Sequence, residues 1–283
     1  PRCVESSTPY SPSPLALKTR LAVQAFVRTS SDRQGPADPA LPAIQAMGLD
    51  FSNPIGLAAG FDRCGMLLDG AARSGLGSVE LGSLVAESPD FDRARSALRV
   101  FRSVRPRGNP LVVGVSLMPR PHSPWRQAPI EIASCLRGLR GLADYVTLNP
   151  GRAGSTPADC LERFGAIVEH AVRSAGPGPS LPQLVVKLPA AWSAGVEPVP
   201  IAAAFARLGA RGLLIAAERS GAHDHAASLR RLRLAFGPSL CLISVGGIDT
   251  PGTAALRLAA GATLIQIHCA ARGSRRIEWI DET

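Results

Sequence analysis

The sequence predicts an α/β protein that folds as a (β/α)8 TIM barrel with a short N-terminal helical extension. Eight short apolar segments recur from residue 54 onward at intervals of about 22–39 residues, and segments rich in alanine, leucine and arginine separate them. Their length and nearly continuous hydrophobicity are typical of parallel strands that are buried on both faces. The chain has 283 residues, which suits a single barrel of about 250 residues. A doubly wound sheet is the alternative, because counting strands does not show whether the sheet closes.

The first part of the chain differs in composition and is predicted to be an extension outside the barrel. Residues 1–13 and 29–41 are rich in proline, serine, aspartate and glycine, and we expect loops there. Between them, Leu15–Arg28 is predicted to be a helix. Its apolar side chains do not gather on one face, so the pattern favours a helix that packs on the protein over one that lies in a membrane surface. We therefore assign residues 1–45 to the extension and residues 46–283 to the barrel.

The strands and helices of the barrel are predicted from hydrophobicity and from the residues that flank them. The strands are predicted at Pro54–Ala59, Ser78–Gly82, Leu111–Leu117, Tyr145–Asn149, Leu184–Leu188, Gly212–Ala216, Cys241–Val245 and Thr263–His268. Helices are predicted at Pro157–Ser174, Val199–Leu208, Ala226–Phe236 and Pro251–Ala260. Thr250 is placed to cap the last of these helices, and Pro251 suits its first turn. Gly209 and Gly261 stand where helices should end.

Composition and charge narrow the classes of function. With 46% hydrophobic and 19% charged residues, the chain resembles a globular protein with a large core rather than a disordered or disulfide-stapled one. The net charge of +9 comes almost entirely from scattered arginines without a nucleic-acid recognition motif, and we expect no nucleic-acid partner. The six cysteines and five histidines show no zinc-type spacing, which predicts that there is no metal site.

The sequence also bears on localisation. It contains no run of about 18 uninterrupted apolar residues, so we expect no transmembrane helix. The first residues lack the apolar core of a signal peptide. We therefore expect a cytoplasmic protein, with peripheral attachment to the inner face of a membrane as the alternative.

Chemistry in a barrel of this class lies at the carboxyl ends of the strands and in the loops that follow. At the end of the first strand, Ala58, Ala59 and Gly60 are small enough for a flat ligand to approach the backbone. The second strand contains Glu80 and ends near Ser83, which offers a hydroxyl group. A carboxylate inside a buried strand is costly without a partner, so we expect an arginine to pair with Glu80.

Two later strand ends carry residues that suit an anionic ligand. Lys187 is one of only two lysines in the chain, and we interpret it as a cation that faces a ligand at the end of the fifth strand. After the seventh strand, Gly246 and Gly247 precede a helix, and backbone N–H groups there can hold a phosphate. His268, at the end of the eighth strand, either assists there or is a structural histidine.

Together these residues resemble the dihydroorotate dehydrogenases, in particular the membrane-associated class 2 enzymes. The resemblance rests on motifs spread over most of the chain, namely Met47–Asp62, Gly75–Ser83, Arg99–Arg102, Leu142–Tyr145, Val185–Lys187, Val245–Ile248 and Gly261–Gln266. It implies a barrel that binds FMN, oxidises dihydroorotate in pyrimidine biosynthesis and passes electrons to a quinone.

The resemblance also implies roles for individual residues. Ser83 would hydrogen-bond the flavin, Lys187 would stabilise negative charge on the reduced ring, and the glycine pair after the seventh strand would hold the phosphate. Arg63 and Asn149 stand at positions that bind substrate in the family. The implied cofactor-binding residues are Ala58, Ala59, Gly60, Ser83, Asn149, Lys187, Gly246, Gly247, His268 and Cys269.

The catalytic part of the family pattern is not matched. Where the family has Asn-x-Ser-Ser/Cys-Pro-Asn with a serine or cysteine as base, this chain has Asn149–Gly154, and Arg152 occupies the base position. A guanidinium stays protonated and cannot accept a proton. The Asn-Thr-Thr that follows the sixth strand in the family is Ala217–Arg219 here, and the phosphate-contacting Gly-Gly-Leu-Ser-Gly loop is missing. Most orotate-binding residues are therefore absent, and we expect that dihydroorotate is not the substrate.

Two hypotheses remain open at this point. The first is an FMN-dependent oxidoreductase that acts on a CH–CH bond of another small molecule, with Ser155, His122 or Cys64 as a new base. The second is a non-catalytic barrel that serves as a binding or scaffold protein, whose open face is covered by a protein partner or a second copy of the chain. Lys187 favours the first and Arg152 favours the second. A quinone is expected as a partner by resemblance alone.

Overall fold

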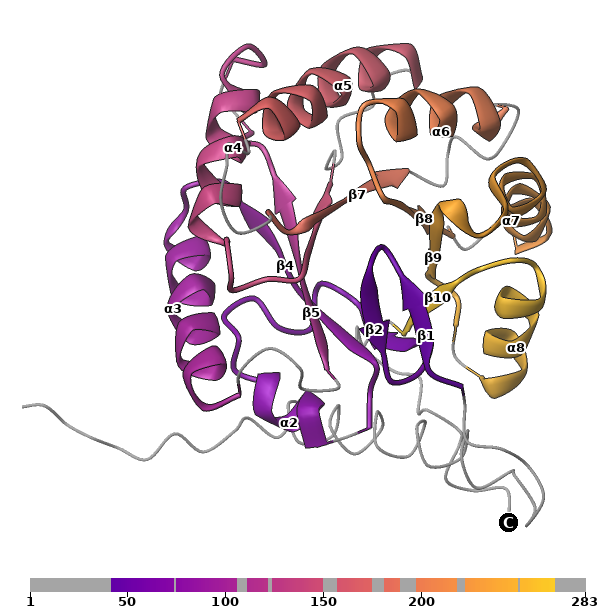
Figure 1. The fold of residues 1–283 in the computed structure, drawn as a ribbon, viewed down its shortest axis with the longest axis horizontal. Helices are drawn as coiled ribbons and strands as arrows, with labels where there is room; N and C mark the ends of the chain where they lie inside the picture. Colours follow the sequence, from indigo (N-terminus) through magenta and orange to yellow (C-terminus); the bar gives the residue numbers. More distant parts are fainter. Residues whose placement is uncertain are drawn as a thin grey trace, which may run out of the picture.

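Eight parallel strands form a closed barrel in the order β10-β3-β4-β5-β6-β7-β8-β9 (Figure 1). The computed structural model describes residues 42–73, 75–105, 111–121, 124–149, 157–174, 181–188, 197–217, 222–248 and 250–267. The barrel strands are β3 Ile55–Leu57, β4 Ser78–Val85, β5 Val112–Met118, β6 Tyr145–Leu148, β7 Gln183–Leu188, β8 Gly212–Ala216, β9 Cys241–Val245 and β10 Leu264–Ile267. Closure between β10 and β3 confirms the predicted (β/α)8 class and excludes the doubly wound sheet.

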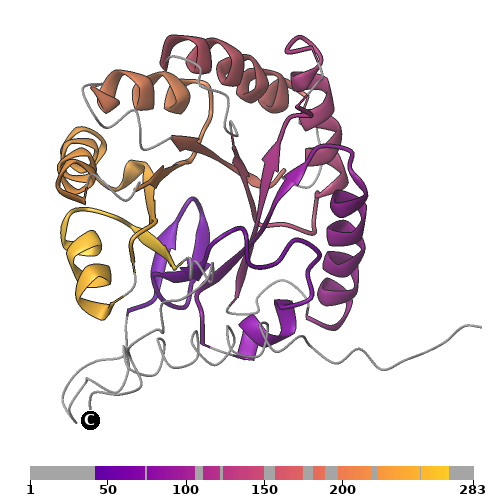
Figure 2. The same cartoon turned by 180° about the vertical axis from the view of Figure 1, so that it is seen from behind.

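Helices surround the barrel on its outside, as the front and back views show (Figures 1 and 2). They are α2 Leu68–Arg73, α3 Pro89–Val104, α4 Ala128–Gly138, α5 Pro157–Arg173, α6 Pro198–Arg207, α7 Ala222–Phe236 and α8 Pro251–Ala259, with a short 3-10 helix, η2 Gly237–Ser239, after α7. The Thr250 hydroxyl accepts a hydrogen bond from the Thr253 backbone N–H at 3.0 Å, so the predicted cap of α8 is confirmed. Gly209 and Gly261 follow helices with φ angles of 104° and 110°, values that favour glycine.

The two faces of each strand have different surroundings, because successive side chains point to opposite sides. On β5, Val113, Val115 and Leu117 belong to the large apolar layer between barrel and helices, whereas Val112 and Ser116 alternate with them and face the barrel interior. The interior of the barrel is therefore a separate compartment, apolar at one end and lined by polar side chains toward the other. This polar part is where a ligand-binding site can form.

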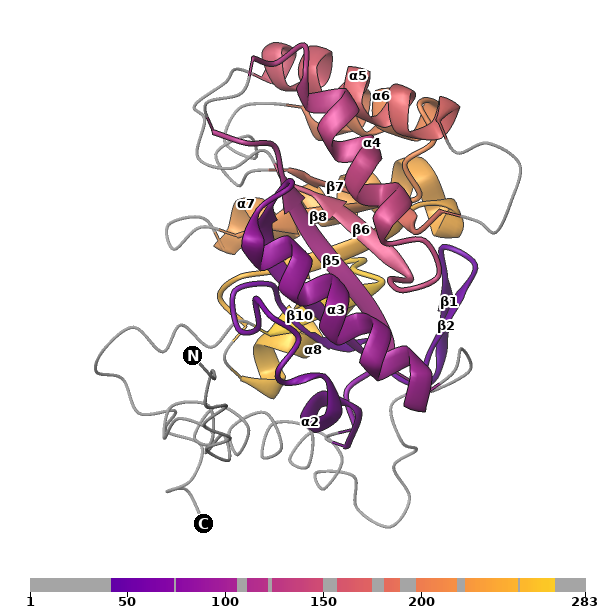
Figure 3. The ribbon, with the colours of Figure 1, turned by 90° about the vertical axis from the view of Figure 1, so that its left-hand side faces the viewer.

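A β-hairpin that the sequence analysis missed covers the N-terminal end of the barrel. Its strands, β1 Ile44–Ala46 and β2 Leu49–Phe51, are antiparallel and are joined by Met47 and Gly48, which both have positive φ angles. The side view shows the hairpin at one end of the barrel (Figure 3). Phe51 of the hairpin packs in one apolar cluster with barrel residues, namely Val112, Tyr145, Val185, Leu214, Cys241, Ile243 and Leu264. Because several of these residues begin their strands, the hairpin closes the N-terminal end and leaves the carboxyl ends as the entrance.

A largely buried ion pair joins two of the motifs that carry the family resemblance. The Arg102 guanidinium on α3 contacts the Asp144 carboxylate at 2.5 Å, and its Nε donates to the Leu142 carbonyl oxygen at 2.9 Å. The same Asp144 oxygen accepts a hydrogen bond from the Val113 backbone N–H at 2.8 Å. This pair fixes α3 and the start of β6 to β5, at the end of the barrel opposite the candidate site.

The predicted N-terminal helix at Leu15–Arg28 lies outside the described residues, as do residues 268–283 at the other end of the chain. The division of the chain at residue 45 stays a prediction.

Candidate functional site

The carboxyl end of β3 forms one wall of the barrel entrance. Ala58 is buried, and its backbone N–H donates to the Ile267 carbonyl oxygen at 3.0 Å. Ala59 is half-buried and Gly60 is exposed. Gly60 has a φ angle of 111° and donates its backbone N–H to the Gly82 carbonyl oxygen at 2.5 Å. Three small residues thus bring bare backbone to the entrance, which lets a flat ligand approach closely.

A buried carboxylate shapes the loop that follows. Oδ1 of Asp62 accepts hydrogen bonds from the backbone N–H groups of Cys64, Gly65 and Met66 at 3.0, 2.7 and 3.0 Å. Its Oδ2 accepts a hydrogen bond from the Leu67 N–H at 2.7 Å. Asp62 is only 3% exposed, so these four bonds compensate for the loss of water around a charged group. The carboxylate acts as an internal template for the loop, and Cys64 lies within it.

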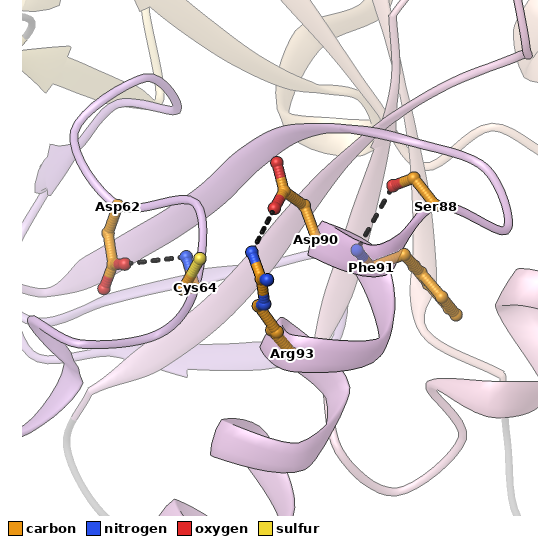
Figure 4. A network of polar contacts seen from close by, with 6 residues as sticks. All are labelled: Asp62, Cys64, Ser88, Asp90, Phe91 and Arg93. Atoms are coloured by element: carbon orange, nitrogen blue, oxygen red, sulfur yellow. Dashed lines mark hydrogen bonds and ion pairs between the residues drawn. The ribbon is translucent and has the colours of Figure 1, made fainter.

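This loop lies beside the beginning of α3, as the close view shows (Figure 4). The Ser88 hydroxyl caps α3 by accepting a hydrogen bond from the Phe91 N–H at 3.3 Å, and Asp90 pairs with Arg93 one turn later at 3.2 Å. Arg63, predicted to bind substrate, is exposed in the same loop. The loop therefore has a fixed backbone and carries an arginine that is free to reach a ligand.

Three polar side chains from neighbouring strands meet at the entrance. The hydroxyl oxygens of Ser83 and Ser116 are 2.9 Å apart, and the Asn149 amide donates to the Ser83 oxygen at 2.8 Å. Ser116 and Asn149 are buried and Ser83 is half-buried. The structure thus brings together two predicted site residues, Ser83 and Asn149. Ser116 was not predicted, although a polar residue on the interior face of β5 was a signal that could have found it.

Deeper in the barrel, the Glu80 side chain is buried among neutral polar groups. One oxygen, Oε2, accepts hydrogen bonds from Thr147 Oγ1 at 2.9 Å and Gln266 Nε2 at 2.8 Å, and the Tyr145 hydroxyl is a further partner. No arginine pairs with Glu80 among the described residues, so the expected arginine partner was wrong. Thr147 on β6 and Gln266 on β10 lie two strands away from β4 on either side, so neutral donors approach Glu80 from both directions. Burial raises the pKa of Glu80 above its usual value, and the hydrogen bonds oppose that rise.

Lys187 lies on β7 and is half-buried. Burial lowers the pKa of its ammonium group, and the nearby Glu80 opposes that change. Within the described residues, no hydrogen bond or ion pair of this ammonium group occurs. The entrance therefore contains a partly desolvated cation whose donors are available to a ligand.

The loop after β9 combines a glycine turn with the start of a helix. Gly246 and Gly247 have φ angles of 92° and 63°. A Cβ atom on Gly246 would lie 2.5 Å from the Ala217 carbonyl oxygen, so only glycine allows the loop to pack against the end of β8. At Gly247 the nearest atom to such a Cβ would be Nη2 of Arg257, at 3.9 Å. A glycine turn that leads into a helix N-terminus is an arrangement that binds phosphate groups in many proteins.

Five other predicted residues lie outside the described part of the chain. They are Arg152 at the base position, His268 and Cys269 after the last strand, and the candidate bases Ser155 and His122. Their roles stay predictions.

The described residues contain neither a metal-binding cluster nor a membrane-spanning helix. Among them, no group of three or more histidine, cysteine, aspartate or glutamate side chains is placed to hold a metal ion. In the same part of the chain, none of the helices has both the length and the apolar character needed to cross a membrane.

The known proteins to which this chain is similar include dihydroorotate dehydrogenases. The dihydroorotate dehydrogenase (quinone) of Prochlorococcus marinus (strain MIT 9313) is 29% identical over 320 residues, which cover 88% of this chain and 81% of that protein. The enzyme of the same name from Acidovorax ebreus (strain TPSY) is 30% identical over 287 residues, covering 80% of each chain. No protein-family model matches the chain.

A solved structure of a dihydroorotate dehydrogenase has a similar fold. DHODH from Eimeria tenella, in complex with ferulenol, has a TM-score of 0.69 to this chain at 17% sequence identity. The match covers 91% of this chain and 86% of that one. It supports the barrel architecture over nearly the whole chain.

Proposed function

Because the chain belongs to the dihydroorotate dehydrogenase family, we propose that it is an FMN-binding oxidoreductase whose substrate is not dihydroorotate. The observation that carries this proposal is Lys187. Its ammonium group is partly desolvated at the entrance of the barrel and has no hydrogen bond or ion pair within the described residues. Holding a cation in this way costs free energy, which an electron-rich ligand would recover.

The residues at the entrance fit the parts of FMN. The bare backbone at Ala58, Ala59 and Gly60 suits the flat ring system, and Lys187 suits the edge of the ring that becomes negative on reduction. The loop at Gly246 and Gly247 suits the phosphate. When bound, FMN accepts a hydride from a substrate carbon. The residues present thus match a ring, an anionic edge and a phosphate around the same end of the barrel.

The chain's own polar groups would hold and orient these parts. Asn149 donates a hydrogen bond to Ser83, whose hydroxyl also contacts Ser116, so these side chains would be held in place before a ligand binds. Lys187 would donate to the ring edge, with Glu80 beneath it favouring its charged form. Arg63, exposed on the loop built around Asp62, would bind a carboxylate of the substrate.

The proposed substrate differs from dihydroorotate because the chain lacks the groups that would recognise and deprotonate it. Arg152 stands where the family has a serine or cysteine base, and a guanidinium cannot accept a proton. On the interior face of β5, Ser116 offers a hydroxyl rather than an amide, and that hydroxyl contacts Ser83. Without the amide side chains that would hydrogen-bond the dihydroorotate ring, the site has little means of selecting dihydroorotate over other acids. We therefore expect a carboxylic acid with an adjacent CH–CH bond, bound through Arg63.

The test is an FMN titration followed by visible absorption and gel filtration. We expect a flavin spectrum that remains with the protein. Lys187→Met should weaken FMN binding about tenfold or more, because it removes the charge and keeps the apolar stem. Lys18→Met removes the only other lysine, lies in the predicted extension, and should bind FMN as the unmodified protein does. Failure to retain FMN at saturating concentrations would overturn the proposal.

Activity is tested on the flavin-loaded protein with a panel of dihydro-acids and dihydroorotate. Bleaching of the flavin absorption by an acid other than dihydroorotate is the expected result. Bleaching by dihydroorotate alone would contradict the substrate proposal.

The second candidate, a non-catalytic barrel, is favoured by Arg152. Bound FMN that no acid in the panel reduces would support it.

A further inference from the structure

Behind the glycine turn lies a buried arginine that has no counter-ion among the described residues. Arg257, on α8, is only 5% exposed, and its Nη1 atom has no hydrogen-bond partner within the described residues. The same described residues provide no carboxylate that forms an ion pair with it. A buried charge that is neither paired nor hydrogen-bonded is costly, and such groups are rare unless they serve a ligand.

A second buried group beside it also has an unused polar atom. His225, on α7, is 1% exposed, and its Nε2 atom is 2.8 Å from the hydroxyl oxygen of Ser244 on β9. Its other ring nitrogen, Nδ1, has no hydrogen-bond partner among the described residues. Arg257 is close enough to His225 to lower the pKa of the imidazole further, to about 4, after burial as the larger cause. Three elements therefore bring two incompletely satisfied groups into one buried cluster.

This cluster lies directly behind the turn that precedes α8. A Cβ atom on Gly247 would lie 3.9 Å from Nη2 of Arg257, and nothing else would lie within 4 Å of it. The guanidinium therefore backs the glycine turn without a side chain between them. The turn is exposed at Gly247, and α8 begins at Pro251 with its N-terminus capped by Thr250.

We propose that Arg257 is the counter-charge for a phosphate monoester held at the Gly246–Gly247 turn and the N-terminus of α8. The N–H groups of the glycine turn and the dipole of α8 provide the contact surface, because Pro251 has no N–H and the Thr253 N–H already donates to Thr250. The guanidinium provides the full positive charge that they lack. His225 completes the cluster as a neutral neighbour. Arg257 is a positioning residue in this arrangement, because it acts through the turn rather than on reacting atoms. Burial lowers the pKa of the Arg257 guanidinium, which is consistent with a charge that awaits an anion.

This inference rests on the proposed function in so far as FMN is the ligand that brings the phosphate. The experiment compares FMN with riboflavin, which has the same ring and no phosphate. Arg257→Met should weaken FMN binding about tenfold or more and leave riboflavin binding unchanged. Arg211→Met changes the net charge equally at an exposed position before β8 and should leave both affinities unchanged. The inference would be overturned if the ratio of the FMN affinity to the riboflavin affinity were the same in Arg257→Met as in the unmodified protein.

A second measurement separates this inference from the flavin proposal. Thermal unfolding of the flavin-free protein is followed with inorganic phosphate and with sodium chloride at the same ionic strength. We expect phosphate to raise the unfolding temperature of the unmodified protein and of Arg211→Met, but not of Arg257→Met. If neither flavin binds, a phosphate shift that depends on Arg257 still supports the site, and the flavin proposal alone fails. The proposed role of Arg257 is refuted if phosphate shifts the unfolding temperature equally in all three proteins, or in none of them.

The stability of the variants without phosphate excludes a merely structural arginine. Removing an unpaired buried charge should leave the unfolding temperature unchanged or raise it, whereas removing an arginine that stabilises the fold should lower it. Arg257→Lys keeps the charge without the planar fork, and we expect it to retain part of the phosphate shift. A folded Arg257→Lys with no phosphate shift at all would contradict the role of charge.

Discussion

Acid should destabilise this protein through one histidine in particular. His225 is buried against Ser244 and Arg257, and burial, with a smaller contribution from Arg257, lowers the pKa of its imidazole to about 4. In the unfolded chain the pKa is about 6.5. Between these two values the unfolded state takes up a proton that the folded state does not, so the free energy of unfolding falls as the pH falls. The difference of about 2.5 pH units, at about 1.4 kcal/mol for each, corresponds to about 3.5 kcal/mol once both states are fully protonated, and most of this is lost by pH 4.

The measurement is urea unfolding followed by circular dichroism at several pH values from 7.5 to about 4, in chloride buffers without phosphate. His225→Gln retains an amide that can hydrogen-bond Ser244 but has no group that titrates in this range. The unmodified protein should therefore lose about 3 kcal/mol more than His225→Gln between pH 6.5 and 4. Because carboxylates contribute equally to both proteins, the difference isolates the histidine.

A matched control is His170→Gln, which replaces a partly exposed histidine on α5. Its stability should follow that of the unmodified protein across the whole pH range. Parallel curves for the unmodified protein and His225→Gln would refute the reasoning, because they would mean that His225 takes up a proton equally well in the folded state. Added phosphate gives a further check, since an anion near Arg257 would offset its charge and reduce the acid loss.

Three further predictions concern the barrel and its loops, all measured by urea unfolding. Gly114→Ala would place a Cβ atom 2.1 Å from Cζ of the Tyr145 ring, and we expect a loss of about 3 kcal/mol, whereas Gly138→Ala, whose nearest neighbour would be 3.5 Å away, should cause no loss. Asp62→Asn removes the charge that accepts four backbone hydrogen bonds and should cost about 2 kcal/mol; an unchanged midpoint would contradict its role as a template. Arg102→Met leaves the largely buried Asp144 carboxylate without its cation, and we expect a loss of about 3 kcal/mol. A loss below about 0.5 kcal/mol would mean that the ion pair does not stabilise the fold.

The order of strands and helices could be predicted from the sequence because each barrel strand is a local apolar run. The strand at Gly212–Ala216 was predicted with its observed bounds, and so was the strand at Cys241–Val245. The hairpin formed by Ile44–Ala46 and Leu49–Phe51 was missed, because strands of three residues are too short to show a period. A turn with two positive φ angles at Met47 and Gly48 gave only a weak signal, since methionine is unusual in that conformation.

The positions of site residues could be predicted better than their partners. Residues at strand ends, such as Ser83 and Asn149, were expected at the entrance, and their side chains do contact one another across 66 positions of sequence. The partners of Glu80 were predicted wrongly, because Gln266 lies 186 positions away and approaches only once the barrel closes. His225 and Arg257 were not singled out at all. No sequence pattern marks a buried charge without a partner, because its neighbours come from distant parts of the chain and are known only from the fold.

The motifs that carry the family resemblance differ in what they say about chemistry. The Arg102–Asp144 pair joins two of them and fixes α3 and β6 to β5, so its presence follows from the need to build the barrel. A barrel that had lost all catalysis would still need this pair. Lys187 is different, because no described residue pairs with it and burial works against its charge.

Burial works against the charge of Lys187, and the nearby Glu80 offsets part of that cost, so an electron-rich ligand at the entrance would recover the remainder. A related argument applies to Arg257, behind the Gly246–Gly247 turn, whose Nη1 has no hydrogen-bond partner among the described residues. Two cations that carry a desolvation cost, one suited to a ring and one to a phosphate, therefore stand where a ligand with both features would make them favourable. This argues for a bound flavin even though Arg152 occupies the position of the family's base, and it separates the binding of the cofactor from the identity of the substrate.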